Sequence, residues 1–184
     1  MKQKFYYLLL FFFIVCMGNC SKDDLIQIFP GDNEKVIDVK MYDVGLKFYL
    51  QNEQGEPTTT FKEGENFSIC CSIENYRNEL VLVSNTFPPD DIGLVYKSNG
   101  SLIGKADGYN GYRLTISHFG ILPNESRMNC FSWMDAKVNE QQPLPPGDYY
   151  VGFNYKFDLT KPDNEQYKDA VTDEMKFRVY FTVE

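Results

Sequence analysis

The chain has 184 residues, of which 43% are hydrophobic and 24% charged, and its formal net charge is −8. This balance is typical of a globular protein and excludes a disordered tail, a collagen-like repeat and a disulfide scaffold. The acidic excess also argues against a nucleic-acid-binding protein, because no basic field exists to displace counterions from phosphates.

The N-terminus has the organisation of an export signal. Lys2 and Lys4 precede an uncharged apolar run of eleven residues, Phe5 to Val15. A membrane-spanning helix needs about 20 apolar residues, so this run is too short to cross a bilayer and has the proportions of a secretory signal. We therefore interpret residues 1–19 as a signal peptide.

A cysteine directly follows the small or uncharged residues Met17-Gly18-Asn19, and this arrangement resembles a bacterial lipobox. The resemblance implies that Cys20 receives a diacylglycerol and begins the mature chain, so that acyl chains hold a soluble domain on a membrane. The alternative is an ordinary secretory signal with Cys20 as an unmodified thiol. Loss of Lys2 and Lys4 with the signal changes the net charge from −8 to −10.

The residues after this cysteine are polar and acidic. They are Ser21, Lys22, Asp23 and Asp24, and they resemble the export signal of Bacteroidetes-type surface lipoproteins. That resemblance implies an outer-membrane location with the domain exposed at the cell surface. A periplasm-facing anchor and a simple solvated tether remain the alternatives. Residues 20–35, which include the turn sequence Pro30-Gly31-Asp32-Asn33, are expected to form the tether.

Period-two alternation of apolar and polar residues dominates the chain beyond the tether. It is clearest in four segments, Leu46–Leu50, Phe67–Ile73, Tyr149–Phe157 and Met175–Val183. Shorter candidate strands are Glu79–Thr86, Ile92–Lys97, Tyr112–His118 and Arg127–Trp133. The sequence Ser98-Asn99-Gly100-Ser101 predicts a hairpin turn, because Asn-Gly accepts positive φ at both central positions. The best chance of a helical turn lies within Lys161–Asp173. About eight or nine strands predict one antiparallel β-sandwich over residues 36–184.

Three motifs occur in the order and spacing of a known module. They are Gly64-Glu65-Asn66-Phe67 before a strand ending Ile73-Glu74-Asn75, then Leu122-Pro123-Asn124-Glu125 followed by Trp133, then Pro145-Pro146-Gly147-Asp148-Tyr149. Over about 90 residues, Gly64 to Phe153, they resemble the BsuPI-type intracellular proteinase-inhibitor module and Ig-like lipoproteins of Bacteroidetes.

This resemblance implies an Ig-like antiparallel β-sandwich of about eight or nine strands. It also makes a protease inhibitor the alternative function. Asn124 stands where the family usually has Gly, and Asn can adopt the left-handed conformation. No reactive loop is identifiable in the sequence, and a secretory signal conflicts with an intracellular inhibitor.

Few residues suit catalysis or metal binding. His118 is the only histidine, and no nucleophile motif accompanies it, so we expect a structural residue at a strand end and no enzyme. The acidic segments Asp90-Asp91 and Asp158–Glu174 do not follow a calcium-loop pattern. We therefore expect neither a metal site nor a cofactor.

Three cysteines lie in the expected domain. Cys70 and Cys71 are adjacent, so their side chains point to opposite faces of a strand and only one of them can face Cys130. The sequence does not decide which of the two that is. We favour buried thiols that pack as small apolar residues over a disulfide.

Tyrosines on polar strand faces are the candidate contact residues. Tyr150 lies on the polar face of its strand, as do Tyr49 and Tyr180, and Tyr109 and Tyr112 flank Asn110-Gly111. A ring with a hydroxyl suits contact with a protein or a glycan, and the alternative is cross-strand packing between tyrosines.

Taken together, these patterns predict a non-catalytic binding or assembly module. It is expected to be attached to the outer membrane through a lipid on Cys20. Tyr109, Tyr112 and Tyr150 are its candidate contacts with a protein or glycan partner that the sequence does not identify.

Overall fold

The computed structural model describes residues 25–83, 86–109, 119–159 and 172–184. Within these ranges the chain forms twelve β-strands and no helix. The expected strand Tyr112–His118 and most of the expected helical segment Lys161–Asp173 lie outside the described residues.

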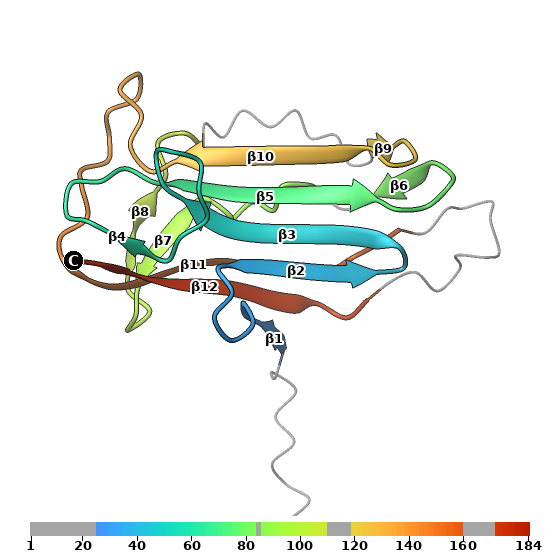
Figure 1. The fold of residues 1–184 in the computed structure, drawn as a ribbon, viewed down its shortest axis with the longest axis horizontal. Helices are drawn as coiled ribbons and strands as arrows, with labels where there is room; N and C mark the ends of the chain where they lie inside the picture. The colour runs from blue at the N-terminus through green and yellow to red at the C-terminus, as the bar shows by residue number, and fades with distance from the viewer. Residues whose placement is uncertain (1–24, 84–85, 110–118, 160–171) are drawn as a thin grey trace, which may run out of the picture.

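Two sheets pack face to face in a sandwich (Figure 1). The larger has the order β1 (Ile26–Ile28), β12 (Met175–Val183), β11 (Gly147–Tyr155), β7 (Leu94–Lys97) and β8 (Leu102–Lys105), and β4 (Thr60–Phe61) also pairs with β12. The smaller has the order β10 (Ser126–Ser132), β5 (Ser68–Asn75), β3 (Val44–Gln51) and β2 (Val36–Met41). Strands β6 (Val81–Val83) and β9 (Phe119–Ile121) form a separate ribbon.

The prediction of an all-β sandwich is confirmed, and most strand pairs are antiparallel as expected, but β1 and β4 pair with β12 in parallel. The four alternating segments form β3, β5, β11 and β12, because each has one apolar face to bury between the sheets. The number of strands exceeds the expected eight or nine, since β1, β4 and β9 are too short to show a period and β2 is not among the predicted strands.

Aromatic side chains fill the core between the sheets. Phe48 of β3 meets Phe153 of β11 edge to face, with ring centroids 4.7 Å apart, and this contact joins the two layers. A second cluster consists of Phe61, Phe67, Trp133, Tyr149 and Phe181. Full burial of each such side chain contributes about 1.5–3 kcal/mol, so these rings are a large part of the driving force for folding.

Residues 26–28 fall within the predicted tether, yet they form strand β1 on the larger sheet. The strand pairs in parallel with the beginning of β12, with Ile26 opposite Met175 and Ile28 opposite Phe177. The sheet therefore begins ten residues earlier than the expected domain boundary at residue 36, and a shorter segment separates it from Cys20.

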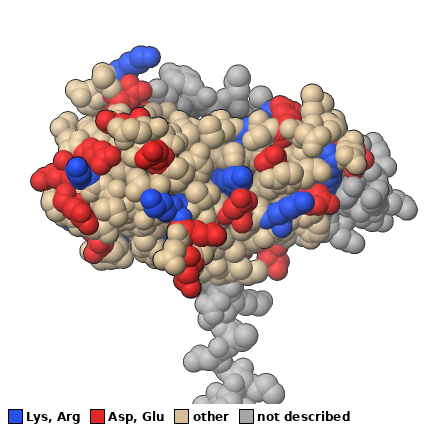
Figure 2. Space-filling view, viewed as in Figure 1, with Lys and Arg blue, Asp and Glu red and all other residues tan. Residues whose placement is uncertain are grey.

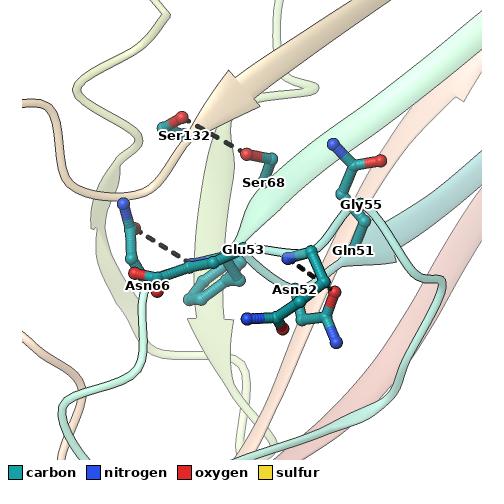
Figure 3. Close-up of a pocket in the computed structure, with 9 residues that line it drawn as sticks. Gln51, Asn52, Glu53, Gly55, Asn66, Ser68 and Ser132 are labelled. Carbon is teal, nitrogen blue, oxygen red and sulfur yellow. Dashed lines mark hydrogen bonds between the residues drawn. The ribbon is translucent and has the colours of Figure 1, made fainter.

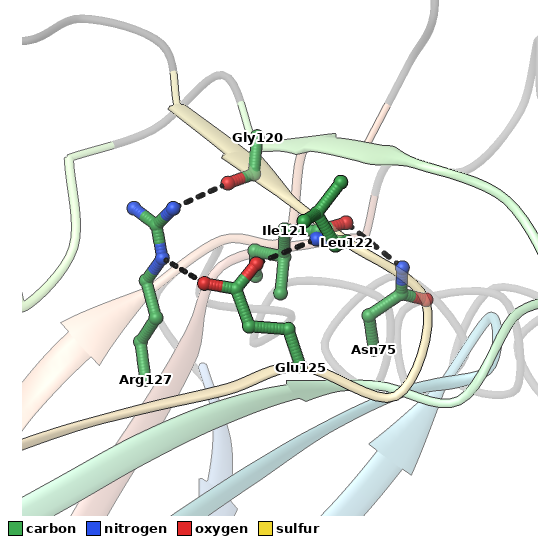
Figure 4. Close-up of polar contacts among 6 residues, drawn as sticks. All are labelled: Asn75, Gly120, Ile121, Leu122, Glu125 and Arg127. Carbon is green, nitrogen blue, oxygen red and sulfur yellow. Dashed lines mark hydrogen bonds and ion pairs between the residues drawn. The ribbon is translucent and has the colours of Figure 1, made fainter.

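The motif Leu122-Pro123-Asn124-Glu125 forms a tight turn (Figure 4). Asn124 has φ 59°, the left-handed conformation expected where the family has Gly. The Glu125 carboxylate accepts a hydrogen bond from the Leu122 N–H at 2.7 Å, and this bond holds the pKa of Glu125 below its usual value. Arg127 bridges Glu125 and the Gly120 carbonyl.

Asn75, at the end of β5, ties this turn to the core. It is fully buried, and its side-chain amide donates to the carbonyl oxygens of Ile121 and Glu79 at 2.9 and 2.8 Å. Its side-chain oxygen accepts from the Arg77 N–H. A buried amide of this kind must have its hydrogen bonds satisfied, so the Ile73-Glu74-Asn75 motif is explained by folding.

Cys70 and Cys130 form a disulfide, so the expectation of unbridged thiols is wrong. Strands β5 and β10 are antiparallel neighbours, and their register places Cys70 directly opposite Cys130. Cys71 points to the other face and is buried in the core as a thiol. The bridge lies on the outer face of the smaller sheet, where Cys130 is exposed.

We predict that reduction of this disulfide lowers the free energy of unfolding. The bridge closes a loop of 60 residues, and the chain-entropy model gives about 4 kcal/mol for such a loop. Denaturant titration of residues 20–184 with and without dithiothreitol measures the difference. A Cys71→Ala variant is the control, since its response to dithiothreitol should equal that of the wild type. An unchanged transition midpoint on reduction in both proteins would contradict the prediction.

Candidate ligand-binding end of the sandwich

Several of the sequence-predicted site residues lie outside the described residues. These are Cys20, Ser21, Lys22, Asp23, Asp24, Tyr112 and His118. The proposed lipid attachment and export signal therefore stay predictions from the sequence.

The structure differs from the expectation that Tyr109 and Tyr150 are available contact residues. Both are buried, with 8% and 7% of their surfaces exposed. Tyr109 packs edge to face on Phe131 and lies beneath the Lys105 ammonium, 4.1 Å from the ring centroid. Tyr150 does lie on the outer face of its strand, but neighbouring side chains cover it. Neither ring offers a free face to a partner.

The cover over Tyr150 is a row of stacked aromatic side chains. Tyr96, Tyr150 and Tyr180 occupy opposing positions on β7, β11 and β12, and Phe29 continues the row beyond β12. The ring centroids are 5.0 Å apart for Tyr96 and Tyr150, and 5.5 Å apart for Tyr150 and Tyr180. The Arg178 guanidinium lies over the Tyr150 ring, 4.6 Å from the ring centroid. The cross-strand packing alternative therefore describes these tyrosines.

A small hollow of about 200 Å³ lies beside this row, above Gly152. A Cβ atom at Gly152 would clash with the Phe177 carbonyl oxygen, so the close approach of β12 requires glycine here. Asp91 lines the hollow and is half-buried; burial raises the pKa of this carboxyl above its usual value. The hollow brings Asp91 close to Asn154, whose N–H lies 3.4 Å from the carboxylate.

A larger hollow of about 400 Å³ opens at one end of the sandwich (Figure 3). The end of β3 and the loop after it supply Gln51, Asn52 and Glu53. The segment leading into β5 supplies Asn66, and the first residue of β5 supplies Ser68. Ser132 of β10 closes it, with its hydroxyl oxygen 3.2 Å from that of Ser68. These polar side chains come from three distant segments of the chain.

A second hollow of about 360 Å³ adjoins the first and shares Glu53 and Asn66 with it. Its remaining walls come from the loop between β10 and β11 and from Asp107. Asp107 is 3% exposed and accepts hydrogen bonds from the N–H groups of Asp135 and Gln141. This carboxylate therefore positions the loop. We refer to the two hollows together as the amide-lined end, because seven Asn or Gln residues line them: Gln51, Asn52, Gln54, Asn66, Asn139, Gln141 and Gln142.

Some of these amides stabilise the site itself. Asn66 donates to the Met134 carbonyl at 2.9 Å and accepts from the Met134 N–H at 3.0 Å, which joins β5 to the loop after β10. The Asn52 oxygen accepts the N–H groups of Gln54 and Glu56 and shapes the loop after β3. Gln54 and Gln142 are exposed and lie at the rim of the hollows. The frame is thus rigid, while the rim presents polar groups to a ligand.

Neither hollow is lined by lysine or arginine. Elsewhere, acidic and basic side chains are interspersed over one broad face of the molecule (Figure 2). Among the described residues no group of three or more potential metal ligands occurs. The described part of the chain also contains no helix long and apolar enough to cross a membrane.

Sequence reasoning missed the amide-lined end. Its residues belong to loops that are far apart in the chain and carry no motif of fixed spacing. The one available signal is the amide-rich composition of Gln51–Gln54 and Asn139–Gln142, each of which follows a predicted strand.

The residues behind the resemblance to the inhibitor module are structural. Gly64 has φ 88° in a turn, and Trp133 is buried with its indole N–H bonded to the Gln142 carbonyl. The Tyr149 hydroxyl donates to the Pro145 carbonyl at 2.7 Å and closes the loop before β11. Turn and core residues of this kind support the fold and give no specific support to protease inhibition.

No protein-family model matches the chain, and no curated protein is similar to it. Several solved structures resemble it weakly. The C-terminal domain of wzt aligns with TM-score 0.38 and 11% identity over 84% of this chain and 81% of its own. The yjhA protein from Bacillus subtilis aligns with TM-score 0.34 and 12% identity, covering 85% and 99% of the two chains. A PapD-like domain of human CEP192 has TM-score 0.34 and 12% identity, covering 90% and 97%.

We predict that Asp91→Asn stabilises the protein at neutral pH but not in acid. Because burial raises the pKa of Asp91, the folded state prefers the protonated carboxyl. The protonated carboxyl favours folding fully below the ordinary aspartate pKa, about 3.9. This contribution to the free energy of unfolding is lost as the pH rises through the pKa of Asp91 in the folded state. The stability difference between Asp91→Asn and wild type should therefore grow from pH 4 towards pH 7.

Thermal unfolding at a series of pH values measures this difference. Asp173→Asn is the control, because it makes the same substitution at an exposed position. If Asp91→Asn were equally or less stable than wild type at neutral pH, burial would not be the dominant effect on this carboxyl.

Proposed function

We propose that the chain is a lipid-anchored, non-catalytic binding module of the cell envelope. In this proposal a diacylglycerol on Cys20 holds it on the outer membrane, with the domain exposed at the cell surface. Its ligand is an uncharged glycan bound at the amide-lined end. The observation behind the choice of ligand is that seven amide side chains, and no lysine or arginine, line two adjoining hollows.

The chemistry of these side chains suits sugar hydroxyl groups. A carboxamide both donates and accepts hydrogen bonds, as a sugar hydroxyl does, so each amide at the rim can form two bonds to neighbouring hydroxyls. Glu53 and Asp135 add acceptors for further hydroxyl groups. An anionic ligand would meet these carboxylates without a cation to balance them, and such an unpaired charge is unfavourable.

The position of this end in the fold supports the same proposal. In Ig-like sandwiches the loops at one end carry binding residues on a rigid frame. Here the frame is held by Asn66 and Asp107, and the rim residues Gln54 and Gln142 are free to bind. β1 follows the proposed anchor and pairs with the beginning of β12, whereas β4 pairs with the end of β12. Phe61 of β4 packs on Phe67, which lines the first hollow, so the hollows lie at the β4 end and away from β1.

We predict that Cys20→Ala abolishes acylation. Metabolic labelling with an alkyne palmitate analogue should mark the wild type and not the variant, because no thiol remains at the lipobox position. Cys71→Ala is the matched control and should label like wild type. Labelling that is unchanged in Cys20→Ala would overturn the anchor. Protease treatment of intact cells tests surface exposure, which digestion only after permeabilisation would contradict.

We predict that neutral oligosaccharides bind the mature chain and that Gln54→Ala combined with Gln142→Ala weakens this binding about tenfold. Two hydrogen bonds, each contributing about 0.5–1.5 kcal/mol, give this magnitude. A glycan array identifies the ligand and calorimetry measures its Kd. Gln27→Ala is the control, since Gln27 is also exposed but lies on β1. Absence of binding to any neutral glycan, or equal Kd values in all three proteins, would refute the assignment.

A further inference from the structure

Two aromatic side chains are exposed together on the outer face of the larger sheet, at its β1 edge. Phe29 and Tyr180 are 44% and 46% exposed. Phe29 and Tyr180 stack on one another, with ring centroids 6.0 Å apart. Single exposed apolar residues are normal on a protein surface, but neighbouring ones mark a contact surface.

Two cations flank these rings. Lys176 lies opposite Gln27 in the β1–β12 register, and Arg178 lies two residues further along β12. The Arg178 guanidinium covers Tyr150 and lies 3.4 Å from the Tyr180 hydroxyl, as donor. In the described ranges neither cation forms an ion pair with a carboxylate. Unpaired cations beside exposed rings stand out in a protein with a strong acidic excess.

The chain before β1 limits how far this edge can lie from the proposed anchor. Six residue steps separate Cys20 from Ile26, and each step spans at most about 3.3–3.6 Å, so the distance is at most roughly 20 Å. Parallel pairing with β12 fixes the direction in which the chain enters the sheet. A lipid on Cys20 would thus keep the β1 edge close to the bilayer surface.

We propose that this edge rests on the lipid headgroups. We name it the β1 patch and define it as Phe29, Lys176, Arg178 and Tyr180, which share the outer face of the sheet. Aromatic rings with a polar atom favour the membrane interface, and the Arg and Lys side chains suit the phosphates of lipid headgroups. The proposal rests on the proposed lipid anchor, and it adds the orientation in which the anchored domain stands.

Tryptophan fluorescence in anchored protein tests the orientation. The mature chain is coupled through the Cys20 thiol to a maleimide lipid in vesicles of phosphatidylethanolamine and phosphatidylglycerol. Coupling is directed to Cys20 because Cys70 and Cys130 are bridged and Cys71 is buried. Phe29→Trp places a probe in the β1 patch. Leu102→Trp is the matched control: Leu102 is 56% exposed on β8, the far edge of the same sheet.

Lipids with brominated acyl chains should quench the introduced tryptophan of Phe29→Trp at least about twofold more than that of Leu102→Trp, because only the β1 patch reaches the interface. The native Trp133 is buried, and its signal is subtracted with the parent protein. Equal quenching in the two variants, or none in Phe29→Trp, would overturn the proposal.

Charge variants test the role of the cations. In the Phe29→Trp background, Lys176→Gln combined with Arg178→Gln should reduce the quenching about twofold in the anionic vesicles, whereas Lys62→Gln, an exposed lysine beside β4, should not. An unchanged value would remove the cations from the proposal. Because coupling is chemical, these results do not depend on acylation in the cell. Failure of the Cys20→Ala labelling test would overturn the native anchor alone, and failure of the quenching test would overturn the β1 patch alone.

Discussion

The arrangement of the whole domain depends on the backbone pairing of β12. This strand, Met175–Val183, hydrogen-bonds along its whole length with β11, at its beginning with β1 and at its end with β4. Its inner face supplies Phe177, Val179 and Phe181 to the core. The segment that leads to Cys20 and the segment that borders the amide-lined end are therefore held on one rigid element. At about 3.3 Å per residue, the part of β12 that pairs with β1 and the part that pairs with β4 lie roughly 15–20 Å apart.

The long strands could be predicted because one face of each strand contacts the core and the other contacts water. In β3 and β12 apolar residues alternate with polar ones, and this pattern leaves little choice of register or face. β1 shows no such pattern, since Ile26 is exposed although it is apolar. What holds β1 in place is a row of backbone hydrogen bonds offered by the edge of β12, and an edge is a property of the assembled sheet.

The cysteines and tyrosines show where a single sequence stops being informative. Strand geometry alone shows that the side chains of Cys70 and Cys71 lie on opposite faces. Which of them forms the disulfide depends on the strand register, which places Cys70 opposite Cys130. Tyr150 lies on the outer face as its position in the strand predicts. Its burial depends on Tyr96 and Arg178, which two other strands bring beside it. The amide-lined end is still harder to predict, because it exists only after Asn66 bonds to the Met134 backbone.

The two proposed surfaces differ in the physical force that each can use. The β1 patch combines rings and unpaired cations, so its attraction to a phosphate-rich interface is both apolar and electrostatic. The rest of the mature chain carries an excess of carboxylates, which an anionic surface repels within about a Debye length, roughly 8 Å at physiological ionic strength. In the proposed orientation, the attraction of the β1 patch to the membrane and the repulsion of the carboxylates from it favour the same arrangement. The β1 end of β12 is held at the membrane, and the rest of the domain is held away from it. The amide-lined end has no cation among its lining residues, so nothing there competes with the β1 patch for the membrane. The proposed site of neutral amides is therefore of the kind that an acidic domain, anchored as proposed, can present away from the bilayer.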